Sequence, residues 1–314
     1  MNKYFKFIIL AVFLLSFSTG CEKVDENKSD ESNTSSLQQI IVENGEIVLP
    51  LTSFKSLNPI YTDNLYYFYF SKLIYEGLFD YDENLKLVPK LAESYTVSDD
   101  GLSIDIKLKE NVLFHDGTEL TAEDVVFTVN MLKNAGTDSI YNDLLKNAYG
   151  DSNYRSISAN TVSKYSLRIY LNKPTTSFLD ILTFPIIPSS TGKLAIVKDN
   201  FTPIGTGPYK FIEYVNNKEI HLKANDDYWG ETPKITYITG KVFENEQLIL
   251  TAFEAGKVNI AKSLEYDWEK YSSNNRVAIK EFVSGEYIGI AVNHEKEFFN
   301  SLYGSEIKKS MMYA

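Results

Sequence analysis

LVPKLAESYTVSDDGLSIDIKLKENVLFHDGTELTAEDVVFTVNML, residues 87–132, contains both strand and helix patterns. The turn signal Asp99-Asp100-Gly101 separates two extended runs, and residues 102–108 alternate apolar with polar side chains as a half-buried strand does. After a second turn at Asp116-Gly117, Thr121 precedes acidic residues and then apolar residues at helical spacing. The stretch therefore predicts a strand pair followed by a helix that begins near residue 122.

The same patterns predict elements outside this unit. Further extended runs are expected at residues 46–51, 165–171, 209–214, 219–223, 236–242, 277–282 and 287–292. Helices are expected over residues 65–78, ending at Gly77, and over residues 244–254, ending at Gly256. The Tyr and Phe residues of 65–78 would also allow a strand. Residues 134–160 are polar and rich in Asn, Ser and Gly, so an irregular excursion is predicted there.

Composition argues against several classes of protein. The 314 residues suggest two domains at about 150 residues each. With 31 basic and 42 acidic residues the net charge is −11, which disfavours a nucleic-acid partner. A single cysteine permits no internal disulfide and no thiolate metal cluster. His115, His221 and His294 lie far apart in the sequence, so no metal site is expected, and His115 is expected to have a structural role in its turn.

Enzyme motifs are weak in this chain. The sequence contains no phosphate-binding G-x-x-x-x-G-K-[ST] and no G-x-S-x-G, and Gly205-Thr206-Gly207 lacks the third glycine of a dinucleotide fingerprint. We therefore expect no enzymatic activity and no cofactor. One enzymatic alternative stays open, an acyl-serine hydrolase that would use Ser190 and Lys193 of an S-x-x-K match.

The N-terminal residues read as a targeting signal. Lys3 and Lys6 precede an eleven-residue apolar run at residues 7–17, which is too short to span a bilayer and fits a secretory signal peptide. Small residues at 18–20 and then Cys21 resemble a bacterial lipobox, which implies that Cys21 is lipidated. A plain signal peptide with a chance cysteine is the alternative. Residues 22–36 are almost entirely polar and predict a flexible tether.

Four blocks carry a family resemblance, in order along the chain. They are residues 57–59 (LNP) with 73–78 (LIYEGL), 89–95 (PKLAESY) with 100–101 (DG), 114–118 (FHDGT) with 121–126 (TAEDVV), and 205–209 (GTGPY) with Asn225, 228–229 (YW) and 255–260 (AGKVNI). Together they resemble the family 5 solute-binding proteins of ABC importers, which include oligopeptide, dipeptide and nickel binders. Residues 306–314 are similar to the helix that opens the second lobe in that family.

The resemblance implies a mixed α/β fold of the periplasmic-binding-protein type II, cluster C. It implies a signal peptide at residues 1–20, a tether at 21–44, lobe I at 45–79 and 190–300, and an inserted subdomain at 80–189. Residues 301–314 would begin lobe II, most of which is expected to be missing. A non-functional, poorly soluble remnant is therefore one alternative.

The resemblance also implies a function. The chain would be a lipid-anchored receptor on the extracytoplasmic face of the cell membrane, or in the periplasm where an outer membrane exists. It would bind short peptides in an interlobe cleft and deliver them to an ABC importer permease. A nickel chelate or an oligosaccharide is the alternative ligand.

Candidate ligand-binding residues follow from the same resemblance. Asp63 and Leu65 match positions that contact the peptide backbone in oligopeptide binders, and Tyr66 lies beside them. Tyr287 and Asn293 are implied at the cleft as well. Gly207 would line the cleft, or serve only close backbone packing. Likewise, Leu65 and the neighbouring tyrosines would otherwise be the first turn of a buried helix.

Overall fold

The computed structural model describes residues 45–135, 139–141, 157–196, 201–262, 269–272, 274 and 276–280. All of them belong to one compact unit, Ile40–Ala314. The predicted site residues Tyr287 and Asn293 lie outside the described residues, as does Cys21.

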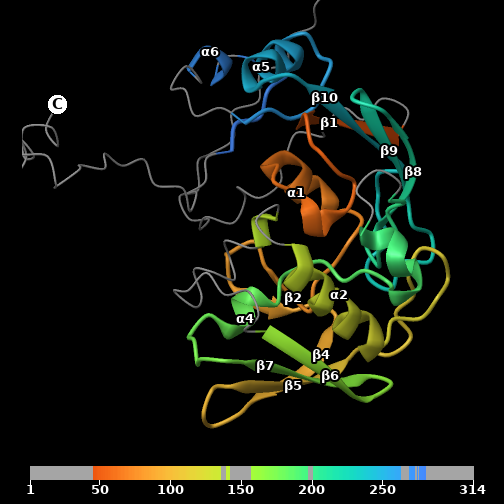
Figure 1. The fold of residues 1–314 in the computed structure, drawn as a ribbon. Helices are drawn as coiled ribbons and strands as arrows, with labels where there is room; N and C mark the ends of the chain where they lie inside the picture. Colours follow the sequence, from red (N-terminus) through yellow and green to blue (C-terminus); the bar gives the residue numbers. More distant parts are fainter. Residues whose placement is uncertain are drawn as a thin grey trace, which may run out of the picture. The chain divides into compact units, whose positions relative to one another are not determined.

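The first sheet joins distant parts of the chain (Figure 1). Its four strands run in the order β1-β10-β9-β8, and they span Glu46–Thr52 (β1), Tyr237–Phe243 (β10), Glu219–Ala224 (β9) and Tyr209–Val215 (β8). β1 pairs with β10 in parallel, whereas the other pairs are antiparallel. The strands predicted at 46–51, 209–214, 219–223 and 236–242 are confirmed.

The second sheet contains the two strands predicted within residues 87–132. Its order is β4-β5-β7-β6, entirely antiparallel, with strands at Ala92–Val97 (β4), Ser103–Leu108 (β5), Ser166–Leu171 (β7) and Ile157–Ser163 (β6). Gly101 takes a φ of +67° in the β4–β5 turn, a conformation that glycine adopts without strain. Helix α2 (Ala122–Ala135) packs on β6 and β7 and buries Val125 and Val129. The predicted strand pair and helix are therefore confirmed.

Smaller elements complete the described residues. They are η2 (Pro59–Tyr61), α1 (Leu65–Ser71), the β2–β3 pair (Phe79–Tyr81 and Leu87–Pro89), α4 (Phe178–Ile181), η5 (Ser189–Ile196), α5 (Glu246–Glu254) and α6 (Glu269–Ser272). Buried apolar side chains form one contiguous core that includes Leu51 and Ile220 of the first sheet and Ile104 and Leu167 of the second. Within these described parts, no helix is long and apolar enough to cross a membrane.

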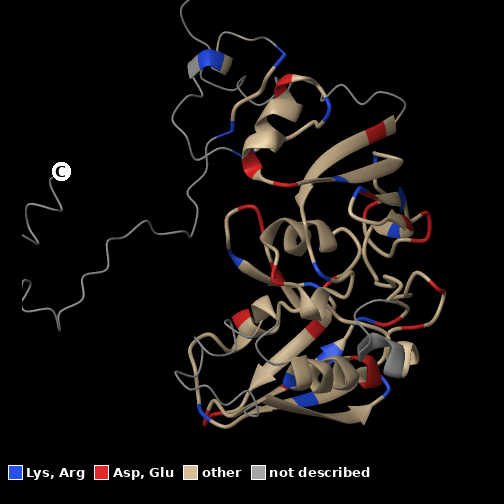
Figure 2. Cartoon of the chain, turned by 45° about the horizontal axis from the view of Figure 1, so that its top comes forward, with Lys and Arg blue, Asp and Glu red and all other residues tan. Residues whose placement is uncertain are grey.

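Charged residues of both signs are interspersed along the described elements (Figure 2). Several form ion pairs at the surface, such as Lys72–Asp80 at 2.7 Å and Arg168–Asp105 at 2.5 Å. Such exposed pairs contribute about 0–1 kcal/mol each, so the core, and not these pairs, supplies most of the stability.

Three predictions of secondary structure differ from the structure. The helix expected over 65–78 ends at Ser71, because the carbonyls of Leu73 and Ile74 accept hydrogen bonds from Tyr209 (3.0 Å) and Gly207 (2.9 Å) instead of continuing the helix. The excursion predicted over 134–160 contains the start of β6, whose inward residues Ile157 and Ala159 alternate with exposed polar ones. Residues 277–280 form no strand, and the rest of that predicted strand pair lies outside the described residues.

Candidate functional site

The Gly205–Tyr209 loop packs against the segment that follows α1. Gly207 N–H donates to the Ile74 carbonyl, and a Cβ at position 207 would lie 2.7 Å from the atoms of that carbonyl. Only glycine fits at this distance, so close backbone packing accounts for Gly207. Its expected contact with a ligand stays a prediction.

His115 ties the same loop to the turn that precedes α2. Its backbone N–H donates to the Gly205 carbonyl at 2.9 Å, and its ring lies between two backbone groups: Nδ1 accepts from Gly205 N–H at 3.3 Å, and Nε2 is 2.9 Å from the Gly207 carbonyl. This arrangement fits a neutral ring with its proton on Nε2. Burial lowers the pKa of His115 to about 4. The expected structural role of His115 is therefore confirmed.

The neutral state of His115 predicts a loss of stability in acid. The pKa is about 4 in the folded protein and about 6.5 in an unfolded chain, so between these values the unfolded state binds the additional proton and folding weakens as pH falls. The full loss attributable to this ring is about 3 kcal/mol. We expect the difference in unfolding free energy between the wild type and His115→Gln to shrink by about that amount from pH 7 to pH 4. Urea denaturation of both proteins at the two pH values measures this difference. A difference in unfolding free energy that is the same at pH 7 and pH 4 would contradict a neutral, buried His115.

A buried carboxylate joins three of the sequence blocks. Glu76 Oε2 accepts hydrogen bonds from Thr206 Oγ1 (2.9 Å) and Trp229 Nε1 (2.8 Å). Its Oε1 accepts from Tyr228 OH at 2.6 Å and lies 3.2 Å from Lys90 Nζ. The Glu76 side chain is only 4% exposed, so these four donors replace its hydration. Burial and the hydrogen bond to Glu76 raise the pKa of Tyr228, which keeps this donor protonated.

Sequence reasoning did not find this cluster. The blocks containing Glu76, Thr206 and Trp229 were recognised individually, but nothing in one sequence shows that three stretches up to 153 residues apart converge. One available signal was the polar residue inside each otherwise apolar or glycine-rich block, since a buried polar group requires a partner.

The predicted residues Asp63, Leu65 and Tyr66 lie together at the start of α1. Asn64 caps this helix by accepting from Tyr67 N–H at 2.8 Å, and Tyr67 is fully buried. Leu65 is 38% exposed, so the alternative interpretation, a buried first turn, holds for Tyr67 and not for Leu65. Asp63 pairs with Lys55 at 2.6 Å on the surface, and Tyr66 OH donates to Glu246 Oε1 of α5 at 3.0 Å.

Gly207 is not part of that surface group, because it packs on Leu73 and Ile74 at the other end of the segment. Ser190, the nucleophile of the hydrolase alternative, is exposed beside Gly192, where two short helices meet across a kink. No cluster of His, Cys, Asp and Glu suited to a metal ion occurs among the described residues.

Solved structures place this fold in a known class. The oligopeptide-binding protein AppA of Bacillus subtilis, solved in complex with a nonapeptide, is similar at a TM-score of 0.61 and 28% identity, over 73% of this chain and 46% of that one. NikZ of Campylobacter jejuni, solved in complex with Ni(L-His), is similar at a TM-score of 0.58 and 28% identity, over 69% and 43%. The fold is that of a type II periplasmic binding protein, of which this chain contains a part.

The family follows from sequence comparison. Residues 86–314 match the model of the bacterial extracellular solute-binding proteins, family 5 Middle. AppA of B. subtilis is 27% identical over 313 residues, 93% of this chain and 53% of the relative, and the glutathione-binding protein GsiB of Escherichia coli O1:K1 is 28% identical over 279 residues, 86% and 52%. The chain belongs to the family 5 solute-binding proteins of ABC importers, and it spans about half the length of these curated relatives.

Proposed function

We propose that this chain is part of a lipid-anchored receptor that binds short peptides, without catalysing a reaction, and delivers them to the permease of an ABC importer. The observation that carries the proposal is the family match over residues 86–314, together with relatives named for binding an oligopeptide and glutathione. Receptors of this type work by closing two lobes over the ligand, whose contacts to both lobes favour the closed state.

The surface group at the start of α1 supports a peptide ligand. Asp63 offers a carboxylate to the N–H groups of a peptide, while Leu65 and Tyr66 offer apolar contact area. The Asp63–Lys55 pair is exposed, so exchanging it for a ligand contact costs about 1 kcal/mol or less. The segment therefore combines polar and apolar groups that are accessible without unfolding.

Replacing Asp63 tests this placement. We expect Asp63→Asn to weaken peptide binding ~10-fold in calorimetric titration, because a charge-assisted hydrogen bond becomes a neutral one. Asp226→Asn is the matched control, since Asp226 is likewise an exposed aspartate with a lysine partner, Lys223, at 3.5 Å. Equal peptide affinities of the two variants would show that Asp63 does not contact the ligand. Whether the protein binds peptides at all would still be decided by the titration of the wild type.

A nickel chelate is the second candidate ligand, because the similar structure of NikZ holds Ni(L-His). Thermal denaturation separates the two. If the protein binds peptides, a pool of short peptides raises its melting temperature, and nickel with L-histidine leaves the melting temperature unchanged. The reverse pattern supports the nickel chelate.

The proposed anchor makes its own prediction. Cys21→Ser removes the thiol that would be acylated, so we expect the variant to move from the membrane fraction to the soluble fraction of its host. Wild-type protein should incorporate labelled palmitate, and the variant should not. If wild type and variant are both found in the soluble fraction and neither takes up the label, a plain signal peptide with a chance cysteine is supported and the anchor is contradicted.

A further inference from the structure

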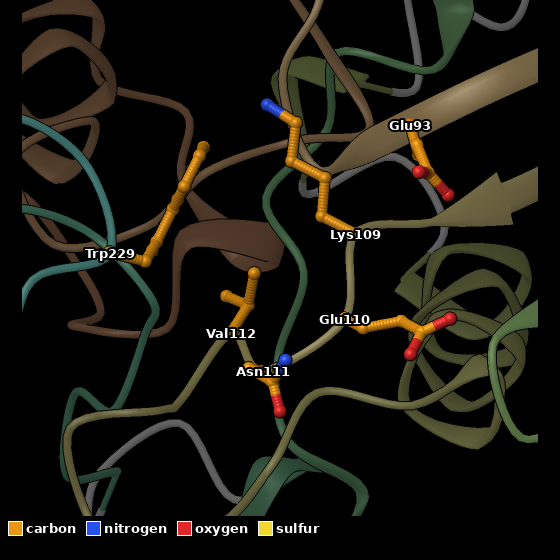
Figure 3. A pocket seen from close by; sticks show the side chains of 6 residues that line it. All are labelled: Glu93, Lys109, Glu110, Asn111, Val112 and Trp229. Atoms are coloured by element: carbon orange, nitrogen blue, oxygen red, sulfur yellow. The ribbon is translucent and has the colours of Figure 1, made fainter.

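A concavity of about 550 Å³ lies beside the Glu76 cluster (Figure 3). Its volume falls within the range of small-molecule sites, about 300–1,000 Å³. Its lining comes from β4, from the turn after β5 and from the loop after β9, and consists of Glu93, Lys109, Glu110, Asn111, Val112 and Trp229. None of these residues belongs to the candidate peptide-binding group.

The apolar wall of the concavity is held in place. Trp229 donates its indole N–H to Glu76, a carboxylate that three further donors fix, so the ring cannot rotate without breaking a buried hydrogen bond. Val112 also lines the concavity but is only 2% exposed, so the accessible apolar surface is that of Trp229. A fixed flat wall of this kind binds a planar apolar group with little ordering cost.

The cation of the concavity has no carboxylate partner among the described residues. Lys109 Nζ lies 4.5 Å from the centroid of the Trp229 ring, and its structural contact is this cation–π interaction. Lys90 is close by, 5.3 Å from the same ring, but it is already paired with Glu76. Burial and the charge of Lys90 lower the pKa of Lys109, and the opposing effect of the Glu76 carboxylate is smaller.

The two carboxylates in the lining are engaged elsewhere. Lys107 lies 2.6 Å from Glu93 and 3.7 Å from Glu110, and Figure 3 shows both carboxylates directed away from Trp229. The charge that faces the apolar wall is therefore that of Lys109. Asn111, held at a φ of +61°, adds an amide at the edge.

We propose that this concavity is a second binding site, which takes a small organic anion with a carboxylate next to a planar apolar group. The carboxylate pairs with Lys109, and the planar group lies against Trp229. The inference does not depend on the peptide-binding function, because the two sets of residues are separate.

Benzoate is the probe, and fluorine NMR of protein labelled with 5-fluorotryptophan is the measurement. The chain has two tryptophans, and Trp268→Phe assigns the Trp229 signal. We expect benzoate to shift that signal saturably at ~1 mM, whereas benzyl alcohol, which lacks the charge, and inorganic phosphate, which lacks the ring, bind at least tenfold more weakly. Equal binding of benzyl alcohol, or no saturable shift with benzoate, would overturn the proposal.

Variants identify the cation. Lys109→Met should weaken benzoate binding at least tenfold, and Lys109→Arg, which keeps the charge, should retain it within threefold. Lys107→Met, in β5 two residues before Lys109, is the matched control, and its effect should stay within twofold because Lys107 pairs with the carboxylates that point away. Lys109 does not hold the anion if Lys109→Met binds benzoate as tightly as the wild type does. The same conclusion follows if Lys107→Met weakens benzoate binding as much as Lys109→Met does.

Discussion

We expect Glu76→Leu to lower the free energy of unfolding by about 4 kcal/mol. The substitution removes a buried carboxylate and leaves Thr206, Tyr228 and Trp229 without their acceptor. Each buried donor left unsatisfied costs about 1–3 kcal/mol, and Lys90 loses its nearest opposite charge as well. The apolar leucine recovers part of this loss by packing, which keeps the net effect below the sum.

Urea denaturation followed by circular dichroism measures the effect. Glu110→Leu is the matched control, because Glu110 is half-exposed and its lysine partner is 3.7 Å away. We expect that control to change stability by about 0.5 kcal/mol or less. The cluster would not have the stabilising role assigned to it if the two variants differed by under about 1 kcal/mol.

Gly205→Ala has the second large effect, with an expected loss of about 3 kcal/mol or failure to fold. A Cβ at this position would lie 2.0 Å from the Ile74 carbonyl oxygen, and the atom that it meets is backbone, which cannot rotate away. Any shift of the loop would also disturb its two hydrogen bonds with His115. The added methyl group would therefore disturb both the packing against Ile74 and the hydrogen bonds with His115.

The appropriate control for Gly205→Ala is Gly117→Ala. Gly117 has a φ of +84° and nothing within 4 Å of an added Cβ, so the control includes conformational strain without a clash. It should cost about 1 kcal/mol. Thermal denaturation of the two variants compares them, and equal melting temperatures would show that the loop moves freely away from Ile74.

The elements that could be predicted are those specified by residues close together in the sequence. The β4–β5 turn at Gly101 and the start of α2 after Thr121 were predictable because turn residues and helix caps act over a few neighbours. The end of α1 was not, since the carbonyls of Leu73 and Ile74 pair with residues more than 130 positions away. β6 was missed because only Ile157 and Ala159 of its seven residues are buried.

The candidate site shows the same division. The sequence placed Asp63, Leu65 and Tyr66 at a helix start, and the structure caps that helix with Asn64, leaves Leu65 exposed and buries Tyr67. It did not predict the Glu76 cluster, because a network of this kind depends on which distant segments the fold brings together. The role of Gly207 is likewise steric, and it becomes visible only once Ile74 is known to lie against it.

Calorimetric titration of the protein purified from the membranes of its own host decides whether this receptor binds peptides. With a pool of short peptides we predict saturable heat and one peptide bound per protein. With nickel and L-histidine under the same conditions we predict no saturable heat. Saturation by the nickel chelate alone, or by neither ligand, would contradict the assignment of this chain to a peptide receptor.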